Sequence, residues 1–240
     1  MIVEMRGVSK RTRKTVKPVI FENLNLRIED GAHIGLLGHI DSGLDAIVDM
    51  ICGADAPDAG RVIRGSKISW PIPDAGFIHK HRSLGATTRF IAQLYEVDPS
   101  AYLSKVVEMA SLQEFVSERL DHCPKSALSR MAFALGACLP FETYLFTAMK
   151  FGDKEDAEQL DQLVADLTRD KGLVLATSQA KAVKKFCNTA FVLDSGRAVY
   201  YEDIEAALEH LERIAPKRAD VEDTAEPVEE EDRQTFDDFL

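Results

Sequence analysis

No run of apolar residues in this chain of 240 residues is long enough to cross a membrane. The longest uncharged stretch, 131–141, has 11 residues, whereas a membrane-spanning helix needs about 20. The first residues also lack the charged-then-apolar plan of a secretory signal peptide. These absences predict a cytoplasmic protein.

Cysteine is scarce, and the four cysteines are widely spaced, with no C-x-x-C pair. This spacing indicates reduced thiols rather than a disulfide framework or a thiolate metal site. The segment His79-x-His81 places two imidazoles close together, but its neighbours are basic and no carboxylate or thiol lies nearby in the sequence, which favours a solvated loop. We therefore predict no metal site. The cysteines are Cys52, Cys123, Cys138 and Cys187.

Basic residues are outnumbered, with 29 Lys and Arg against 40 Asp and Glu, a net charge of −11. An acidic chain repels the phosphates of nucleic acid, and we predict no nucleic-acid partner. Most of this negative charge lies in 217–240, where ten acidic and three basic residues contribute −7 of the net charge of −11. The apolar pattern also stops at Pro216, so 216–240 is predicted to be a disordered acidic tail.

The whole chain has 45% apolar residues, and the part before the tail is long enough for a full core. Short apolar runs alternate with helix-like segments, which predicts an α/β domain with a largely parallel sheet. Phe90, Leu94 and Tyr95 share one face of a predicted helix. Buried strands are expected at 32–37, 144–146 and 173–177, edge strands at 1–9 and 18–28 around a basic hairpin, a hairpin at 190–201, and helices at 46–51, 156–167, 204–214 and within 84–145.

The segment Gly38 to Asp45 lies between a strand-like run and a helix-like run, which is the setting of the phosphate-binding motif G-x-x-x-x-G-K-[ST]. Gly38 and Gly43 have the spacing of its two glycines. The lysine position holds Leu44, however, and the Ser/Thr position holds Asp45. The loop therefore has the frame of a nucleotide site without the two side chains that carry its chemistry.

Seven segments, spread in order over about residues 1–214, resemble the nucleotide-binding subunit of an ATP-binding-cassette (ABC) transporter, and in particular the capsule and O-antigen polysaccharide-export type. The least common of them is Ile68-Ser69-Trp70-Pro71-Ile72. The others are Val8-Ser9-Lys10-Arg11, Gly35-Leu36-Leu37-Gly38, Gly60-Arg61-Val62, Arg89 to Tyr95, Arg130 to Leu135, and Phe186 to Arg197.

The resemblance implies a phosphate-loop core with a small antiparallel β subdomain and an inserted helical lobe at about 84–140, all within 1–215. It implies ATP and Mg²⁺ as cofactors, two cassettes that sandwich two nucleotides, and a permease bound through the helical lobe. The positions that would hold nucleotide are Gly38, Ser42, Gly43, Leu44, Asp45, Ala46 and, where an aromatic ring usually stacks on adenine, Thr12.

The remaining family motifs are replaced as well. Thr147 and Ala148 stand where an aspartate would organise Mg²⁺ and a glutamate would polarise water, and Gln179 stands at the switch histidine. No glutamine occurs near 75–78. The signature segment that would bind the partner's nucleotide contains no glycine; its positions are Lys125, Ser126 and Ala127. These losses predict a cassette that does not hydrolyse ATP.

Three functions fit this combination. The first is a degenerate nucleotide-binding subunit at the cytoplasmic face of the inner membrane, paired with a permease and with an active ABC subunit or a second copy. The second is a regulatory or scaffold protein that binds protein partners and no nucleotide. The third is an ATPase with an atypical site. The tail from Phe236 to Leu240 fits either a docking peptide for a protein partner or a solubilising extension.

Overall fold

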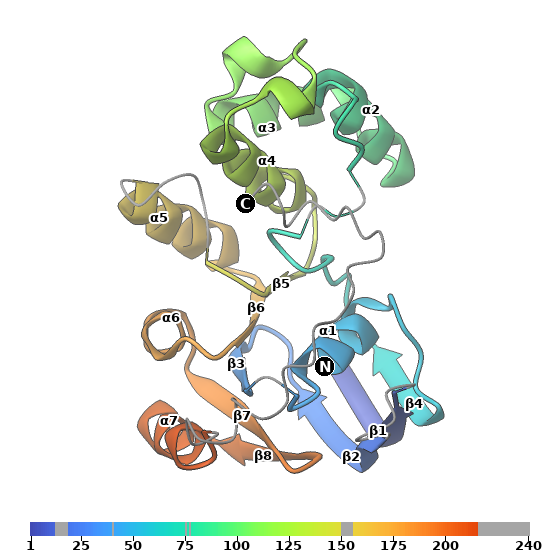
Figure 1. The fold of residues 1–240 in the computed structure, drawn as a ribbon, viewed down its shortest axis with the longest axis vertical. Helices are drawn as coiled ribbons and strands as arrows, with labels where there is room; N and C mark the ends of the chain where they lie inside the picture. Colours follow the sequence, from blue (N-terminus) through green and yellow to red (C-terminus); the bar gives the residue numbers. More distant parts are fainter. Residues whose placement is uncertain (13–18, 40, 75, 77, 150–155, 216–240) are drawn as a thin grey trace, which may run out of the picture. The chain divides into compact units, whose positions relative to one another are not determined.

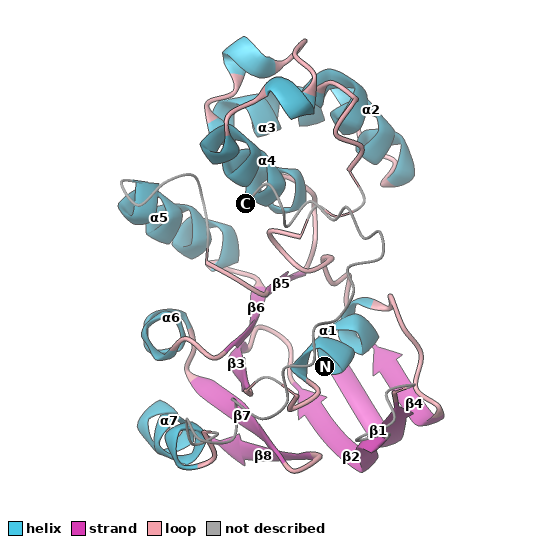
Figure 2. Ribbon diagram, viewed as in Figure 1, coloured by secondary structure: helices cyan, strands magenta, loops and turns pink. Residues whose placement is uncertain are grey.

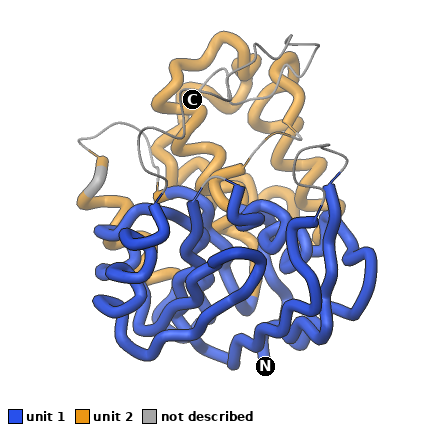
Figure 3. Tube along the Cα trace, turned by 60° about the horizontal axis from the view of Figure 1, so that its bottom comes forward, with its two compact units in different colours: residues 1–71, 142–148, 168–231 blue, residues 72–141, 149–167, 232–240 orange. Residues whose placement is uncertain are grey.

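The computed structural model describes residues 1–12, 19–39, 41–74, 76, 78–149 and 156–215 (Figure 1). The chain forms two compact units (Figure 3). Of the described residues, the first unit contains 1–71, 142–148 and 168–215, and the second contains those within 72–141 and 149–167. The predicted acidic tail and the basic hairpin turn lie outside the described residues.

A five-stranded sheet forms the centre of the first unit, in the order β5-β6-β3-β7-β8 (Figure 2). All neighbours are parallel except β7 and β8, which form an antiparallel hairpin. Every residue of β5 and β6 is buried, as expected for parallel strands covered on both faces. The strands are β3 (His33–Leu37), β5 (Thr143–Phe146), β6 (Gly172–Thr177), β7 (Thr189–Asp194) and β8 (Arg197–Tyr201).

A second, antiparallel sheet has the order β2-β1-β4, with β1 (Val3–Arg11), β2 (Val19–Ile28) and β4 (Ala59–Arg64). Because β1 pairs with both neighbours, the prediction that both N-terminal strands are edge strands is wrong for β1. The alternating pattern of apolar and polar residues is the same in central and edge strands of an antiparallel sheet, so it did not reveal the distant partner β4.

Three helices belong to the first unit: α1 (Leu44–Cys52), α6 (Ala180–Phe186) and α7 (Ile204–Arg213). Helix α1 places four apolar side chains in a core that also contains residues from both sheets. Helix α6 was not predicted, because it has seven residues and only Val183 is buried. The α1 side chains in the core are Ile47, Val48, Met50 and Ile51.

The second unit is helical and contains α2 (Leu84–Leu94), α3 (Pro99–Ala110), α4 (Lys125–Ala137) and most of α5 (Ala157–Thr168). Ten residues of α4 are buried, which makes it the central helix of this unit. The Tyr102 hydroxyl on α3 donates a hydrogen bond to the Leu135 carbonyl on α4, at 2.6 Å. Among the described residues, no helix has the length and apolar character that a membrane span requires.

Substitution of Gly43 tests how closely Ile20 and Phe21 pack against the turn that connects β3 to α1. Gly43 has φ 84°, and a Cβ atom there would overlap Ile20 and Phe21, whereas Gly31, with φ 70°, has open space around it. We expect Gly31→Ala to cost about 1 to 2 kcal/mol through its left-handed backbone. Gly43→Ala should cost about 1 to 3 kcal/mol more, because the methyl group also overpacks the core.

Urea denaturation of the two variants and the natural chain measures this difference. Equal losses of stability in Gly43→Ala and Gly31→Ala would contradict the close packing of Ile20 and Phe21 against the turn.

Candidate functional site

The carboxyl ends of β3, β5 and β6 lie at the same edge of the five-stranded sheet. Leu37, the last residue of β3, pairs with Thr177, the last residue of β6, and Phe146 at the end of β5 pairs with Leu175. The loop from Gly38 to Gly43 therefore begins beside the segments that follow β5 and β6. Ligands of α/β sheets bind at this edge, so the fold brings these predicted positions to one place.

The loop keeps a tightly wound backbone. Asp41 and Gly43 both have left-handed conformations, with φ 67° and 84°. The Ser42 amide donates a hydrogen bond to the His39 carbonyl at 3.0 Å, and α1 begins directly after Gly43. Aspartate tolerates the left-handed region better than most residues. The loop thus winds into a helix N-terminus although the residue at its centre is an aspartate.

The N-terminus of α1 is the part of the loop that would face an anion. Gly43 caps the helix without a side-chain hydrogen bond, and helical N–H groups in a first turn attract negative charge. Leu44 is half-buried and packs against the core. Asp45 is exposed in the first turn, where its carboxylate stabilises the helix dipole by about 0.3 to 1 kcal/mol. The chain thus supplies a negative charge of its own here.

Ser42 fills the space inside the loop. A Cβ atom on Gly38 would overlap the Ser42 hydroxyl, so that hydroxyl rests against the Gly38 backbone. The Ser42 Oγ is buried and has no hydrogen-bond partner among the described residues. A buried hydroxyl without a partner costs about 1 to 3 kcal/mol. The Ser42 side chain therefore lies close against the Gly38 backbone.

His39 connects the loop to α7. Its Nε2 lies 2.8 Å from the carbonyl oxygen of Leu211, and because a carbonyl only accepts, the imidazole donates. Leu211 lies in the last turn of α7, where helix carbonyls lack partners within the helix. His39 therefore caps the C-terminal end of α7. No sequence pattern predicted this contact, because the two residues are 172 positions apart.

The preceding residue of α7, His210, is buried and holds the helix on the β7–β8 hairpin. Its Nδ1 lies 2.9 Å from the Tyr201 hydroxyl, and its Nε2 lies 3.2 Å from Asp194 Oδ2. The Ser195 hydroxyl and then His210 keep the pKa of the Asp194 carboxyl below its usual value. A lowered pKa means that this carboxylate stabilises the fold above the ordinary Asp pKa and loses that contribution as the pH falls through the folded value.

The other predicted positions of the first unit carry no ionisable group. Thr147 and Ala148 are half-buried directly after β5. Gln179 is exposed at the start of α6, and its backbone amide donates a hydrogen bond to the Thr177 hydroxyl at 3.1 Å. Thr12 is half-buried directly after β1. Ala46 packs partly against the core beside Leu44. None of these side chains supplies a carboxylate, an imidazole or a cation.

The predicted signature positions belong to the second unit, where they form the first turn of α4. Lys125 is exposed, Ser126 is half-buried, and Ala127 is buried in the core of the unit. The preceding residue, Pro124, caps the helix without a side-chain hydrogen bond. The first turn of α4 thus presents one exposed ammonium group and no glycine.

The predicted basic loop at 79–82 has a carboxylate that the sequence did not reveal. Asp121 Oδ2 lies 3.0 Å from His81 Nδ1 and 2.6 Å from Arg119 Nη2. The sequence around the histidines does not reveal this carboxylate, because Asp121 lies 40 positions from His81. The Asp121 amide bonds to the Lys80 carbonyl, which pairs two loops 40 residues apart. The Arg119 guanidinium, followed by His81, lowers the pKa of Asp121 to about 2.

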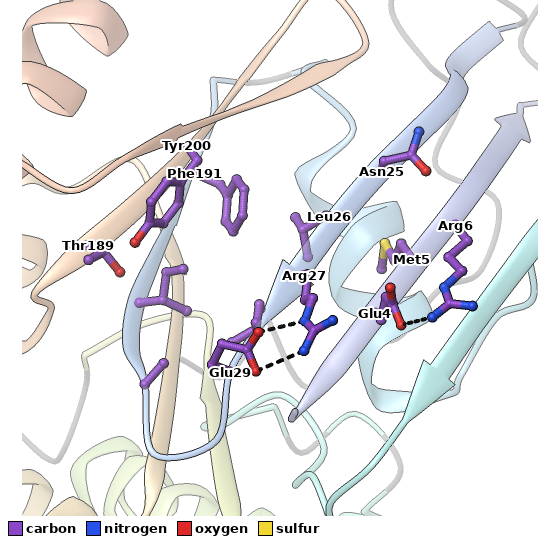
Figure 4. A pocket seen from close by; sticks show the side chains of 13 residues that line it. Glu4, Met5, Arg6, Asn25, Leu26, Arg27, Glu29, Thr189, Phe191 and Tyr200 are labelled. Atoms are coloured by element: carbon purple, nitrogen blue, oxygen red, sulfur yellow. Dashed lines mark hydrogen bonds and ion pairs between the residues drawn. The ribbon is translucent and has the colours of Figure 1, made fainter.

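A 430 Å³ pocket lies at the other end of the sheet strands, near the starts of β3 and β7 (Figure 4). The rings of Phe191 and Tyr200 form one side, with centroids 5.1 Å apart. Its charged side chains pair with one another, since Arg6 bonds to Glu4 at 2.7 Å and Arg27 bonds to Glu29 at 2.6 Å (Figure 4). The remaining lining residues are Met5, Asn25, Leu26, Ile28, Ala32, Ile34 and Thr189. The pocket therefore presents balanced charge and is separate from the phosphate-loop edge.

The cap that His39 provides predicts a coupling between the loop and α7. We expect His39→Ala to speed amide exchange at both the loop and the last turn of α7 by roughly tenfold, because the variant loses one partly buried hydrogen bond. The measurement is hydrogen–deuterium exchange followed by mass spectrometry.

His33→Ala is the matched control, because His33 Nε2 also contacts backbone carbonyls, those of Thr168 and Lys171, both at 3.1 Å. That variant should loosen 168–171 and leave the loop unchanged. Unchanged exchange at α7 in His39→Ala would refute the coupling.

Comparison with known proteins gives a consistent set of relatives, although no family model matches the chain. The ATP-binding protein BexA of Haemophilus influenzae is 27% identical over 192 residues, covering 80% of this chain and 88% of BexA. The capsule polysaccharide export ATP-binding protein CtrD of Neisseria meningitidis is 27% identical over 216 residues, covering 89% of this chain and all of CtrD. The polysialic acid transport ATP-binding protein KpsT of Escherichia coli is 24% identical and covers 87% of this chain.

Solved structures agree on the fold. The dimeric ATP-binding cassette MJ0796, in a post-hydrolysis state bound to ADP and Pi, superposes with a TM-score of 0.71 at 17% identity, covering 85% of this chain and 99% of that one. The ATP-binding subunit of an ABC transporter gives a TM-score of 0.71 at 16% identity, covering 82% and 88%. The chain is thus a homologue of the ATP-binding proteins of capsule polysaccharide export, with the fold of an ABC nucleotide-binding domain.

Proposed function

We propose that this chain is a nucleotide-binding-subunit-like component of a polysaccharide-export ABC transporter that has lost the chemistry of its nucleotide site. The homologues named for capsule polysaccharide export and polysialic acid transport support the transporter assignment. The side chains of the phosphate loop support the loss of nucleotide chemistry.

The observation that carries the proposal is the pair Leu44 and Asp45 at the start of α1. Leu44 is apolar and packs partly against the core, so no ammonium group neutralises a phosphate there. Asp45 adds an exposed carboxylate in the same turn. Two like charges about 4 Å apart repel by about 4 kcal/mol at an effective dielectric of 20, and a nucleoside triphosphate carries several. The residues present do not fit ATP with Mg²⁺.

Hydrolysis has a second obstacle at the ends of the neighbouring strands. Phosphoryl transfer depends on metal ligands, on a residue that orients water and on charge stabilisation. Thr147 and Ala148 offer no carboxylate, and Gln179 offers no imidazole. Restoring phosphate binding alone would therefore not restore turnover.

An assembly follows from the family resemblance. The chain would contact a permease through its helical lobe at the cytoplasmic face of the inner membrane, and it would form the non-hydrolysing half opposite an active ABC subunit or a second copy. Its first turn of α4, with Lys125, Ser126 and Ala127, lacks the glycines that approach a partner's nucleotide. The chain would contribute structure to the assembly and little to the partner's catalysis.

The test is a calorimetric titration of the purified chain with ATP, with and without Mg²⁺, beside the variant Leu44→Lys, Asp45→Ser. The natural chain should release no binding heat. The variant should bind with micromolar affinity, because it regains a cation and a hydroxyl and loses the repulsive carboxylate, and it should show no ATP turnover.

The matched control is Asp49→Ser, which removes an exposed acid one turn further along α1. This variant should release no ATP binding heat, like the natural chain. Micromolar binding of ATP by the natural chain would overturn the proposal. Turnover by the natural chain would establish the atypical ATPase instead.

A further inference from the structure

Helix α2 carries an apolar stripe that the second unit leaves uncovered. The stripe consists of Phe90 and Leu94, whose exposed fractions are 58% and 66%. The two residues are four positions apart and therefore lie one turn apart on the same face. The opposite face of α2 is buried through Leu84, Thr87, Thr88, Ile91 and Ala92. The sequence predicted that Phe90 and Leu94 share a face, and the structure shows that this face meets solvent.

The start of α2 adds positive charge beside the stripe. Arg89 is exposed on the helix, and Arg82 is exposed just before it. Within the part of the chain that the structure describes, neither arginine forms an ion pair. The helix itself contains no acidic residue, and the nearest acids along the chain, Glu96 and Asp98, follow its C-terminal end. A ligand suited to this surface has apolar side chains for the stripe and carboxylates directed toward the start of the helix.

The chain contains a segment of this chemistry. In 216–240, which lies outside the described residues, Phe236, Phe239 and Leu240 have the i, i+3, i+4 spacing of anchors on one face of a bound helix. Asp237 and Asp238 lie between them, and eight further acids precede them from Asp220 onward. Apolar anchors and carboxylates thus occur together in a segment whose net charge is opposite to that of the start of α2.

We propose that Phe236 to Leu240 of the same chain docks on the α2 stripe, with the preceding acids facing Arg82 and Arg89. The 21 residues from Pro216 to Phe236 span up to about 70 Å when extended. This reach is long compared with the radius of gyration of about 18 Å expected for a compact domain of 240 residues. The length of the linker therefore permits docking on α2.

Photo-crosslinking of the full chain tests this docking. We replace Phe239 by p-benzoylphenylalanine, irradiate, digest and locate the cross-links by mass spectrometry. The cross-links should fall within 84–95 of the same molecule. Phe90→Ser with Leu94→Ser should lower the yield by roughly tenfold, because the anchors lose their apolar partners. Tyr200→Ser is the matched control, since it removes an equally accessible aromatic ring from β8, 49% exposed, and should leave the yield unchanged.

A second variant tests the electrostatic part. Arg82→Glu with Arg89→Glu should lower the yield and weaken its dependence on salt, because the acids then meet like charge. Both variants change exposed side chains, and circular dichroism verifies that the helices persist. Cross-links outside α2, or a yield that neither variant changes, would overturn the proposal. Mixing ¹⁵N-labelled and unlabelled chains detects cross-links between two copies, which would overturn docking within one chain.

Discussion

Strand β3 pairs with β6 on one side and with β7 on the other, and this double pairing fixes where the phosphate loop begins. Its four residues from Ile34 to Leu37 are buried, so a shift of register would place unsatisfied backbone groups in the core. The loop, the segments after β5 and β6, and the start of α1 all take their positions from this strand. The fold therefore keeps the geometry of a nucleotide site independently of the side chains in it.

A side chain of the protein itself supplies the negative charge at the N-terminus of α1. A first helical turn attracts negative charge, and Asp45 supplies a carboxylate where a nucleotide phosphate would otherwise do so. Ser42 occupies the space against Gly38, and Leu44 joins the core. Leu44 and Asp45 differ from the phosphate-loop motif, whereas the buried Ser42 hydroxyl, which has no hydrogen-bond partner among the described residues, is a polar group that the loop leaves unsatisfied.

Contacts far apart in the sequence connect this loop to the end of the described chain. His39 caps α7 through Leu211, and the adjacent His210 fixes the same helix turn to Asp194 and Tyr201. Two adjacent residues of α7 therefore bind different elements: Leu211 contacts the loop, and His210 contacts the β7–β8 hairpin. In the second unit, Asp121 joins two loops in a comparable way through Arg119 and His81. The His39 contact satisfies a carbonyl that helix α7 leaves open, whereas the Asp121 contacts join side chains of two loops.

The sequence alone determined the local structure and the chemistry of the loop. Apolar periodicity predicted the buried strands, the hairpin at β7 and β8, and the described helices other than α6, because it reports which residues share a face. The spacing of Gly38 and Gly43, with Leu44 and Asp45 beside them, predicted a nucleotide-site frame without its cation. Periodicity does not report what covers a face, however. Tertiary structure alone placed β1 between two strands, left Phe90 and Leu94 in solvent, brought Asp121 to His81, and joined His39 to α7, because these outcomes depend on partners distant in the chain.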